Sequence, residues 1–145
     1  MRKILLVNGP NLDLLGQREP QIYGSATLAD IEQGMTQRAQ DLGCEVECFQ
    51  SNHEGAILDF LHRKAASAVG VVLNPGALTH YSYSLYDCLR ALPVPVVEVH
   101  ISNIHARPEA FRSTSVTAPA AAGLIAGLGV RGYLTAMEYL IDRNE

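Results

Sequence analysis

The sequence predicts an α/β protein in which five parallel strands form a doubly wound sheet with helices on both faces. Short apolar runs that are typical of buried strands alternate with segments whose apolar residues recur at helical spacing. No repeat, linker or low-complexity segment interrupts this alternation. Regular alternation of this kind is typical of a parallel sheet covered on both faces.

The first half of the chain contains two predicted strands and one well-marked helix. Residues 3–8 form a short apolar run that a Gly-Pro pair ends. Thr27 and Asp30 resemble a capping box, apolar residues then follow at helical spacing, and Gly43 supplies the helix end. In residues 44–48, cysteine and valine alternate with glutamate, which predicts a strand with one wetter face.

Predicted helices and strands continue to alternate to the end of the chain. Ser51 and Glu54 predict a second capping box and a helix after it. The remaining predicted elements are strands at 69–73, 94–100 and 122–128, helices at 82–91 and 130–143, and a polar loop at 102–119. At this length, the flavodoxin-like sheet is the simplest arrangement of five strands.

Bulk composition limits the classes of function. The chain has 145 residues, which favours a single domain over residues 1–145. A formal net charge of −4 argues against nucleic acid or an anionic membrane as the main partner. Three cysteines and an N-terminal apolar run of only four residues, too short for a signal peptide or a membrane span, predict a cytoplasmic protein with reduced thiols.

Polar side chains follow the predicted strands where this architecture binds ligands, outside the carboxyl ends. Glu98 and His100 lie two apart on one strand, so their side chains share a face. The carboxylate can fix the imidazole tautomer and favour the charged ring, which makes a general acid. The alternative interpretation is a structural histidine at a strand end.

Arg18 and Tyr23 lie in a glycine-bounded loop after the first strand. A nearby arginine favours the phenolate of a tyrosine, so Tyr23 can serve as a base, and the loop can close as a lid. A solvated surface loop is the alternative. Arg18, Arg107 and Arg112 are candidates for holding a carboxylate. Candidates for hydrogen bonding to the hydroxyl groups of a polar substrate are Asn74, His80, Asp87 and Ser102.

Other chemistries lack the residues that they need. The glycines from Gly127 to Gly132 match a dinucleotide fingerprint, but the chain ends thirteen residues later, before the acidic ribose ligand expected about 20 residues on. We interpret them as close packing. No cysteine or histidine spacing matches a zinc site, and Lys3 and Lys64 are poorly placed for a Schiff base. The residues alone therefore predict a cofactor-free enzyme that transfers protons on a small polar anion.

Five segments, in this order, resemble the type II 3-dehydroquinate dehydratase family: GPNLDLLGQREPQIYG, QSNHEG, NPGALTHYSYSLYD, EVHISNIHARPEAFR and GLIAGLGVRGY. The resemblance covers nearly the whole chain. It implies a flavodoxin-like fold, conversion of 3-dehydroquinate to 3-dehydroshikimate in the shikimate pathway without a cofactor or metal, and a homo-oligomer, a dodecamer built from trimers.

The resemblance also implies a role for each matching residue. Tyr23 matches the general base, supported by Arg18. Asn11 matches the residue that helps to stabilise an enolate, and His100, partnered by Glu98, matches the general acid. Matches to substrate-binding positions are Asn74, His80, Ile101, Ser102 and Arg112, together with Asp87, which corresponds to an aspartate that reaches a neighbouring subunit's site.

Three features depart from the usual family pattern. Asp13 stands where asparagine is common, Tyr86 stands where arginine is frequent, and the segment between Arg107 and Arg112 is one residue longer. The last difference leaves the role of Arg107 less defined than that of Arg112. Two other functions stay open: a binding module that keeps the pocket without the chemistry, and a lyase or isomerase for a related hydroxy acid.

Overall fold

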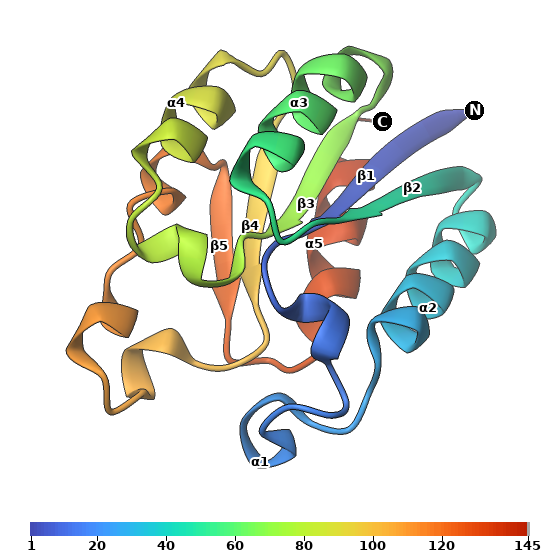
Figure 1. Cartoon of the computed structure of the whole chain (residues 1–145). Coiled ribbons are helices and arrows are strands. Elements are labelled where there is room, and N and C mark those ends of the chain that lie inside the picture. The colour runs from blue at the N-terminus through green and yellow to red at the C-terminus, as the bar shows by residue number, and fades with distance from the viewer. Residues whose placement is uncertain (145) are drawn as a thin grey trace.

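The computed structural model describes residues 1–144 and has the predicted sheet (Figure 1). Within these residues, five strands pair in the order β2-β1-β3-β4-β5, and every neighbouring pair is parallel. The strands are β1 (Arg2–Asn8), β2 (Cys44–Gln50), β3 (Gly70–Asn74), β4 (Val96–His100) and β5 (Gly123–Ala126). This strand order is the flavodoxin-like one, so the predicted fold class is confirmed.

Helices cover both faces of the sheet. One face carries α2 (Leu28–Asp41) and α5 (Arg131–Asp142), and the other carries α3 (Glu54–Lys64) and α4 (Tyr83–Ala91) (Figure 1). A fifth helix, α1 (Pro20–Tyr23), is a single turn outside the sheet. Among the described residues, no helix has the length and apolar character needed to cross a membrane.

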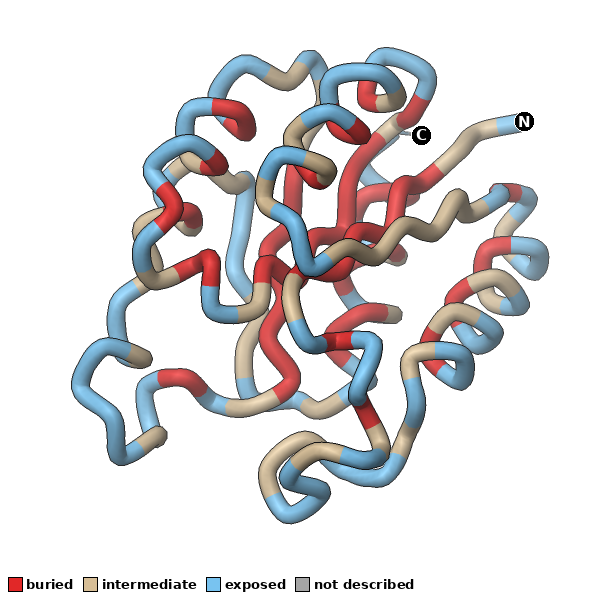
Figure 2. Tube along the Cα trace, in the orientation of Figure 1, coloured by how far each residue is buried: buried red, intermediate tan, exposed pale blue. Residues whose placement is uncertain are grey.

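The core consists of two clusters of side chains, one on each side of the sheet. Figure 2 shows the buried residues concentrated on the central strands and on parts of the helices. Successive residues of a strand point to opposite faces, so Ile4 and Leu6 pack with α2 and α5 while Leu5 and Val7 pack with α3 and α4. All four are fully buried. Because both faces are covered, the central strands read as continuous apolar runs rather than as alternating ones.

One of the two predicted capping boxes is confirmed and the other is wrong. At α2, the Asp30 amide donates to Thr27 Oγ1 at 3.1 Å and the Thr27 amide donates to Asp30 Oδ2 at 3.0 Å. At α3 the N-cap is His53, whose side chain makes no cap bond. Ser51 Oγ instead accepts from the His53 amide at 2.9 Å, a local turn that takes this hydroxyl away from the helix end.

The remaining predicted elements exist, with shifted ends. The strands predicted at 69–73, 94–100 and 122–128 are found at β3, β4 and β5, and the last two are shorter than predicted. The predicted polar loop contains three short 3-10 helices, η4 (Ile104–Ala106), η5 (Ala110–Ser113) and η6 (Ala118–Ala120). Such single turns have no apolar period long enough to detect in a sequence.

The glycine-rich segment before α5 serves packing, as the sequence predicts. A Cβ on Gly132 would lie 3.2 Å from Ile125 Cγ2 and 3.3 Å from Val99 Cγ1, closer than most such contacts. Gly127 has a φ of 88°, and a Cβ there would lie 3.0 Å from Asn103 Cβ. These glycines let the helix start close against β4 and β5.

A tyrosine of α5 connects the core to the ends of two strands. Tyr133 is fully buried, and its hydroxyl donates to Asn8 Oδ1 at 2.7 Å and accepts from Asn74 Nδ2 at 2.8 Å. Burial raises the pKa of Tyr133 well above its usual value, so the phenol keeps the proton that it donates. Asn8 and Asn74 end β1 and β3, so this hydroxyl holds two neighbouring strand ends in place.

Tyr133→Phe should lower the free energy of unfolding by about 1–3 kcal/mol, because it leaves polar atoms of Asn8 and Asn74 buried without this partner. Urea denaturation measures the change. Tyr139→Phe is the matched control, since Tyr139 is 51% exposed on the same helix. Equal stability of the two variants would contradict the role of the Tyr133 hydroxyl.

Candidate active site

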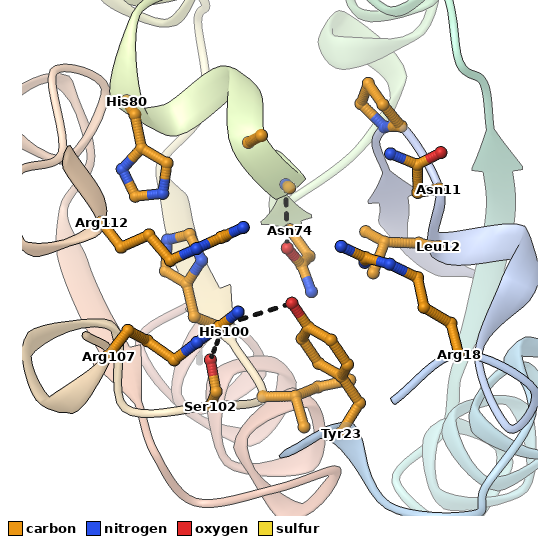
Figure 3. Close-up of a pocket in the computed structure, with 14 residues that line it drawn as sticks. Asn11, Leu12, Arg18, Tyr23, Asn74, His80, His100, Ser102, Arg107 and Arg112 are labelled. Atoms are coloured by element: carbon orange, nitrogen blue, oxygen red, sulfur yellow. Dashed lines mark hydrogen bonds between the residues drawn. The ribbon is translucent and has the colours of Figure 1, made fainter. Parts of the chain in front are cut away.

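A pocket lies at the carboxyl ends of β1, β3 and β4, where the architecture predicts a ligand site. It opens between the loop that contains α1 and the loop that follows β4 (Figure 3). The predicted site residues that line it are Asn11, Arg18, Tyr23, Asn74, His80, His100, Ile101, Ser102 and Arg112. Arg107 also lines it, and Glu98 and Asp87 do not.

Glu98 and His100 form the buried pair that their spacing predicts. Glu98 is 0% exposed and His100 is 6% exposed. Glu98 Oε2 lies 2.7 Å from His100 Nε2. A carboxylate accepts, so Nε2 carries the proton in this contact and Nδ1 is the ring nitrogen left for other partners. Glu98 is covered by its neighbours, so it acts on the pocket only through His100.

Three hydroxyl groups surround the Glu98 carboxylate, and the sequence analysis did not identify them. Thr79 Oγ1 and Ser115 Oγ donate to Oε2 at 2.7 and 2.8 Å, and Thr117 Oγ1 donates to Oε1 at 2.5 Å. Burial alone would raise the pKa of Glu98. The hydrogen bonds from His100, Thr117 and Thr79 outweigh burial, so the pKa lies below its ordinary value and the carboxyl is ionised.

The Tyr23 hydroxyl is held by an arginine from the far side of the pocket. Arg107 Nη1 donates to Tyr23 Oη at 3.1 Å and to Ser102 Oγ at 3.1 Å. The guanidinium carbon of Arg18 lies 5.1 Å from the centroid of the Tyr23 ring, and that of Arg107 lies 5.4 Å from it. Both arginines therefore adjoin the phenol, and Arg107 is the one that contacts its oxygen (Figure 3).

Arg107 and Arg112 extend from the loop after β4 into the pocket (Figure 3). The segment between them contains the start of η5, and the Arg112 amide donates to the carbonyl of Glu109, the residue before η5, at 3.1 Å. Arg112 Nε lies 3.3 Å from Glu109 Oε2 without the alignment of a hydrogen bond. The Nε atoms of both arginines are buried and have no hydrogen-bond partner among the described residues.

Two further polar side chains have fixed orientations. Asn74 Oδ1 accepts from the Gly76 amide at 3.0 Å while Nδ2 donates to Tyr133, so the amide has one orientation. His80 Nδ1 lies 2.7 Å from the Thr114 carbonyl and must donate to it. Burial lowers the pKa of His80; the bond to Thr114 opposes this effect, and the charges of His100 and Arg112 reinforce it. His80 is therefore neutral, with Nε2 as an acceptor.

The pocket thus combines three guanidinium groups, a phenol held by one of them, and an imidazole paired with an ionised carboxylate. Within residues 1–144, no group of three or more histidine, cysteine, aspartate or glutamate side chains could hold a metal ion. Such a set of residues can bind an anion, remove a proton with the phenolate and donate one from the imidazolium.

A family model described as Dehydroquinase class II matches residues 2–141. The chain belongs to this family. A 3-dehydroquinate dehydratase of Bacillus cereus (strain G9842) is 54% identical over 143 residues, which cover 99% of this chain and 97% of the relative.

Solved structures of class II dehydroquinases have the same fold. The type II dehydroquinase of Propionibacterium acnes matches with a TM-score of 0.94 and 43% identity, covering 98% of this chain and 97% of that one. A 3-dehydroquinate dehydratase-like protein of Bifidobacterium longum matches with a TM-score of 0.74 and 33% identity over the full length of both chains. Membership of the class II dehydroquinase family agrees with the resemblance seen in the sequence.

Two of the residues that depart from the usual dehydroquinase pattern lie outside the pocket of this chain. Asp13 is exposed in η1 (Leu12–Leu14). Tyr86 lies on α4, where its hydroxyl accepts from Arg90 Nη1 at 3.0 Å. Asp87 is exposed on the same helix, a position from which it faces solvent rather than the pocket of its own chain.

Glu98→Gln should alter how stability depends on pH. The pKa of Glu98 is lowered on folding, so its charge stabilises the folded chain fully above the ordinary value of about 4.3. That contribution is lost as the pH falls through the lowered value. The stability advantage of the wild-type chain over Glu98→Gln should therefore shrink as the pH falls.

Urea denaturation at a series of pH values measures this advantage. Glu45→Gln, at an exposed carboxyl of β2, is the matched control, and its profile should follow that of the wild-type chain. A difference between wild type and Glu98→Gln that stays constant at all pH values would contradict the ionised state of Glu98.

Proposed function

We propose that this chain removes water from 3-dehydroquinate to give 3-dehydroshikimate, a step of the shikimate pathway, with Tyr23 as general base and His100 as general acid. The family and the names of the relatives support the reaction. The observation that carries the residue roles is that one pocket contains two groups, each held by a hydrogen bond. Arg107 donates to the Tyr23 hydroxyl, and the His100 ring donates to Glu98.

The first step is removal of a proton from the carbon next to the ketone. Donation from Arg107 Nη1 to the phenol oxygen favours the phenolate, and the Arg18 charge near the ring acts in the same direction. The C–H electron pair becomes the carbon–carbon double bond of an enolate as the π pair of the carbonyl moves onto its oxygen. Asn11 lines the same pocket and, together with the guanidinium groups, supplies the dipoles and charges that stabilise the enolate oxygen.

The second step is loss of the hydroxyl group. His100 Nε2 faces Glu98, so the proton that protonates the departing hydroxyl comes from Nδ1. The enolate collapses, the C–O bond breaks, and water leaves as the conjugated double bond forms. Tyr23 ends with one proton more and His100 with one proton fewer, and exchange with solvent restores both groups.

Substrate binding falls to the polar groups around these two residues. The matched residues are Asn74, His80, Ile101, Ser102 and Arg112. The guanidinium group of Arg112 lines the pocket. Arginine binds a carboxylate through a planar fork, which suits an anionic ring.

We also propose that residues 1–145 form a single catalytic domain and that twelve copies assemble as a dodecamer built from trimers. In this assembly Asp87 would contribute to a neighbouring copy's site, for which its exposed place on α4 leaves it available. Sedimentation velocity tests the assembly, and an active monomer would overturn it.

Tyr23→Phe should lower kcat by about 1,000-fold or more and leave KM within a few fold, because it removes the base and little contact surface. A continuous ultraviolet assay with EDTA and no added cofactor measures this, since the conjugated product absorbs where the substrate does not. Tyr139→Phe is the control and should have full activity.

The same assay tests the function itself. No turnover of 3-dehydroquinate by the folded wild-type chain would overturn the proposal and favour a binding module, which calorimetry with the same compound would detect. Near-normal kcat in Tyr23→Phe would leave the reaction standing and refute the assignment of the base.

Arg107→Gln should lower kcat by about 10- to 100-fold, because a charge-assisted hydrogen bond to the phenol oxygen is lost. Arg63→Gln, on the outer end of α3, is a control that should keep wild-type kinetics. If Arg107→Gln raises KM alone, Arg107 serves substrate binding and the support of the phenolate comes from Arg18.

A further inference from the structure

The charges that surround His100 in the pocket are positive. Arg18, Arg107 and Arg112 line the pocket with it, together with His80 and Tyr23, and no Asp or Glu among the described residues does. Three guanidinium groups disfavour a fourth positive charge on the imidazole. The protonated ring that the proposed mechanism needs therefore depends on the negative charge of Glu98, 2.7 Å from Nε2.

A carboxylate that is 0% exposed keeps its charge only if donors replace the water that it has lost. His100 supplies one donor, and the hydroxyls of Thr79, Ser115 and Thr117 supply the others. Both carboxylate oxygens are engaged, because Thr117 donates to Oε1 while the other three donors meet Oε2.

The three hydroxyls come from two segments that are tied together. Thr79 lies in η3 (Gly76–His80), and its carbonyl accepts from the Val116 amide at 2.7 Å. Ser115 Oγ also accepts from the Ala118 amide at 2.9 Å, which fixes its position. Thr117 is fully buried. These contacts hold the three hydroxyls around the Glu98 carboxylate.

We propose that Thr79, Ser115 and Thr117 are positioning residues of the general acid: their hydroxyls hold Glu98 ionised and oriented so that His100 can carry its second proton. This inference rests on the proposed function, in which His100 protonates the leaving hydroxyl. None of the three lines the pocket, so they act on the reaction through Glu98 and His100. Thr117 is the best residue to mutate, because among these donors it alone donates to Glu98 Oε1.

The test compares Thr117→Val, which keeps the shape and loses the donor, with Thr117→Ser, which keeps the donor. Thr117→Val should lower kcat by about 10-fold or more, as for loss of a hydrogen bond to a charged group, with KM within about 3-fold. Thr117→Ser should restore most of kcat. Thr135→Val, at an exposed threonine of α5, is the control and should match the wild-type chain.

Two readouts separate positioning from a structural role. In Thr117→Val, the alkaline limb of the profile of kcat against pH should move to lower pH, and so should the NMR titration of the His100 ring. The reason is that a less well solvated Glu98 carboxylate stabilises the protonated ring less. In a Glu98→Gln background, Thr117→Val should cost less than about 2-fold in kcat, because the charge that the hydroxyl serves is already absent.

An equal loss of kcat in both backgrounds, or a loss with unchanged pH behaviour, would overturn the inference while leaving the proposed function intact. Absence of turnover in the wild-type chain would instead refute the function, and the NMR titration would still test whether the hydroxyl supports the charge. If Thr117→Val does not fold, Ser115→Ala removes a donor to Oε2 and is judged by the same readouts.

Discussion

All five strands run in one direction, and the rest of the structure follows from this constraint. Parallel neighbours need crossover connections, so helices cover both faces and the strand ends meet at one edge. In the order β2-β1-β3-β4-β5, β1 and β3 are neighbours, and the chain leaves them in different directions. The loops after these two strands pack tightly: the Gly9 amide donates to the Asn74 carbonyl at 2.8 Å, and a Cβ on Gly9 would lie 2.4 Å from the Pro75 carbonyl oxygen. The pocket lies beside this contact.

The electrostatics of the pocket then have a definite arrangement. Positive groups are at its surface, on loops, and Glu98, the negative group that pairs with the imidazole, is behind it near the end of a central strand. Burial strengthens the interaction of Glu98 with His100 because water no longer screens it. Burial also imposes a desolvation penalty on the charged carboxylate. The hydroxyls of Thr79, Ser115 and Thr117 supply the missing solvation without adding charge.

The sequence predicts what depends on short-range periodicity. Alternation of strands and helices predicts the sheet, and a spacing of two places Glu98 and His100 on one face of β4. Contacts between distant loops have no such pattern. Arg107 and Tyr23 are 84 residues apart, and their hydrogen bond depends on how η4 and α1 are placed. Thr79 and Thr117 were not predicted, because no local pattern marks a threonine as the buried partner of a distant carboxylate such as Glu98. Ser51 illustrates a different error. Its sequence pattern fits a capping box, but its hydroxyl forms a local turn with the His53 amide instead.

The two proposed proton-transfer groups are supported in different ways. His100 is 6% exposed at the end of a central strand, so the packing of the sheet sets its position. Tyr23 lies on a single turn of helix between glycines that both have positive φ, Gly16 at 88° and Gly24 at 84°, and no buried residue belongs to that turn. The Tyr23 side chain packs against the core cluster of α2 and α5. Arg107 adds a link to the end of β4, because one nitrogen bonds both Tyr23 Oη and Ser102 Oγ, and Ser102 is two residues beyond His100. A single guanidinium thus connects the Tyr23 hydroxyl with the segment that directly follows His100.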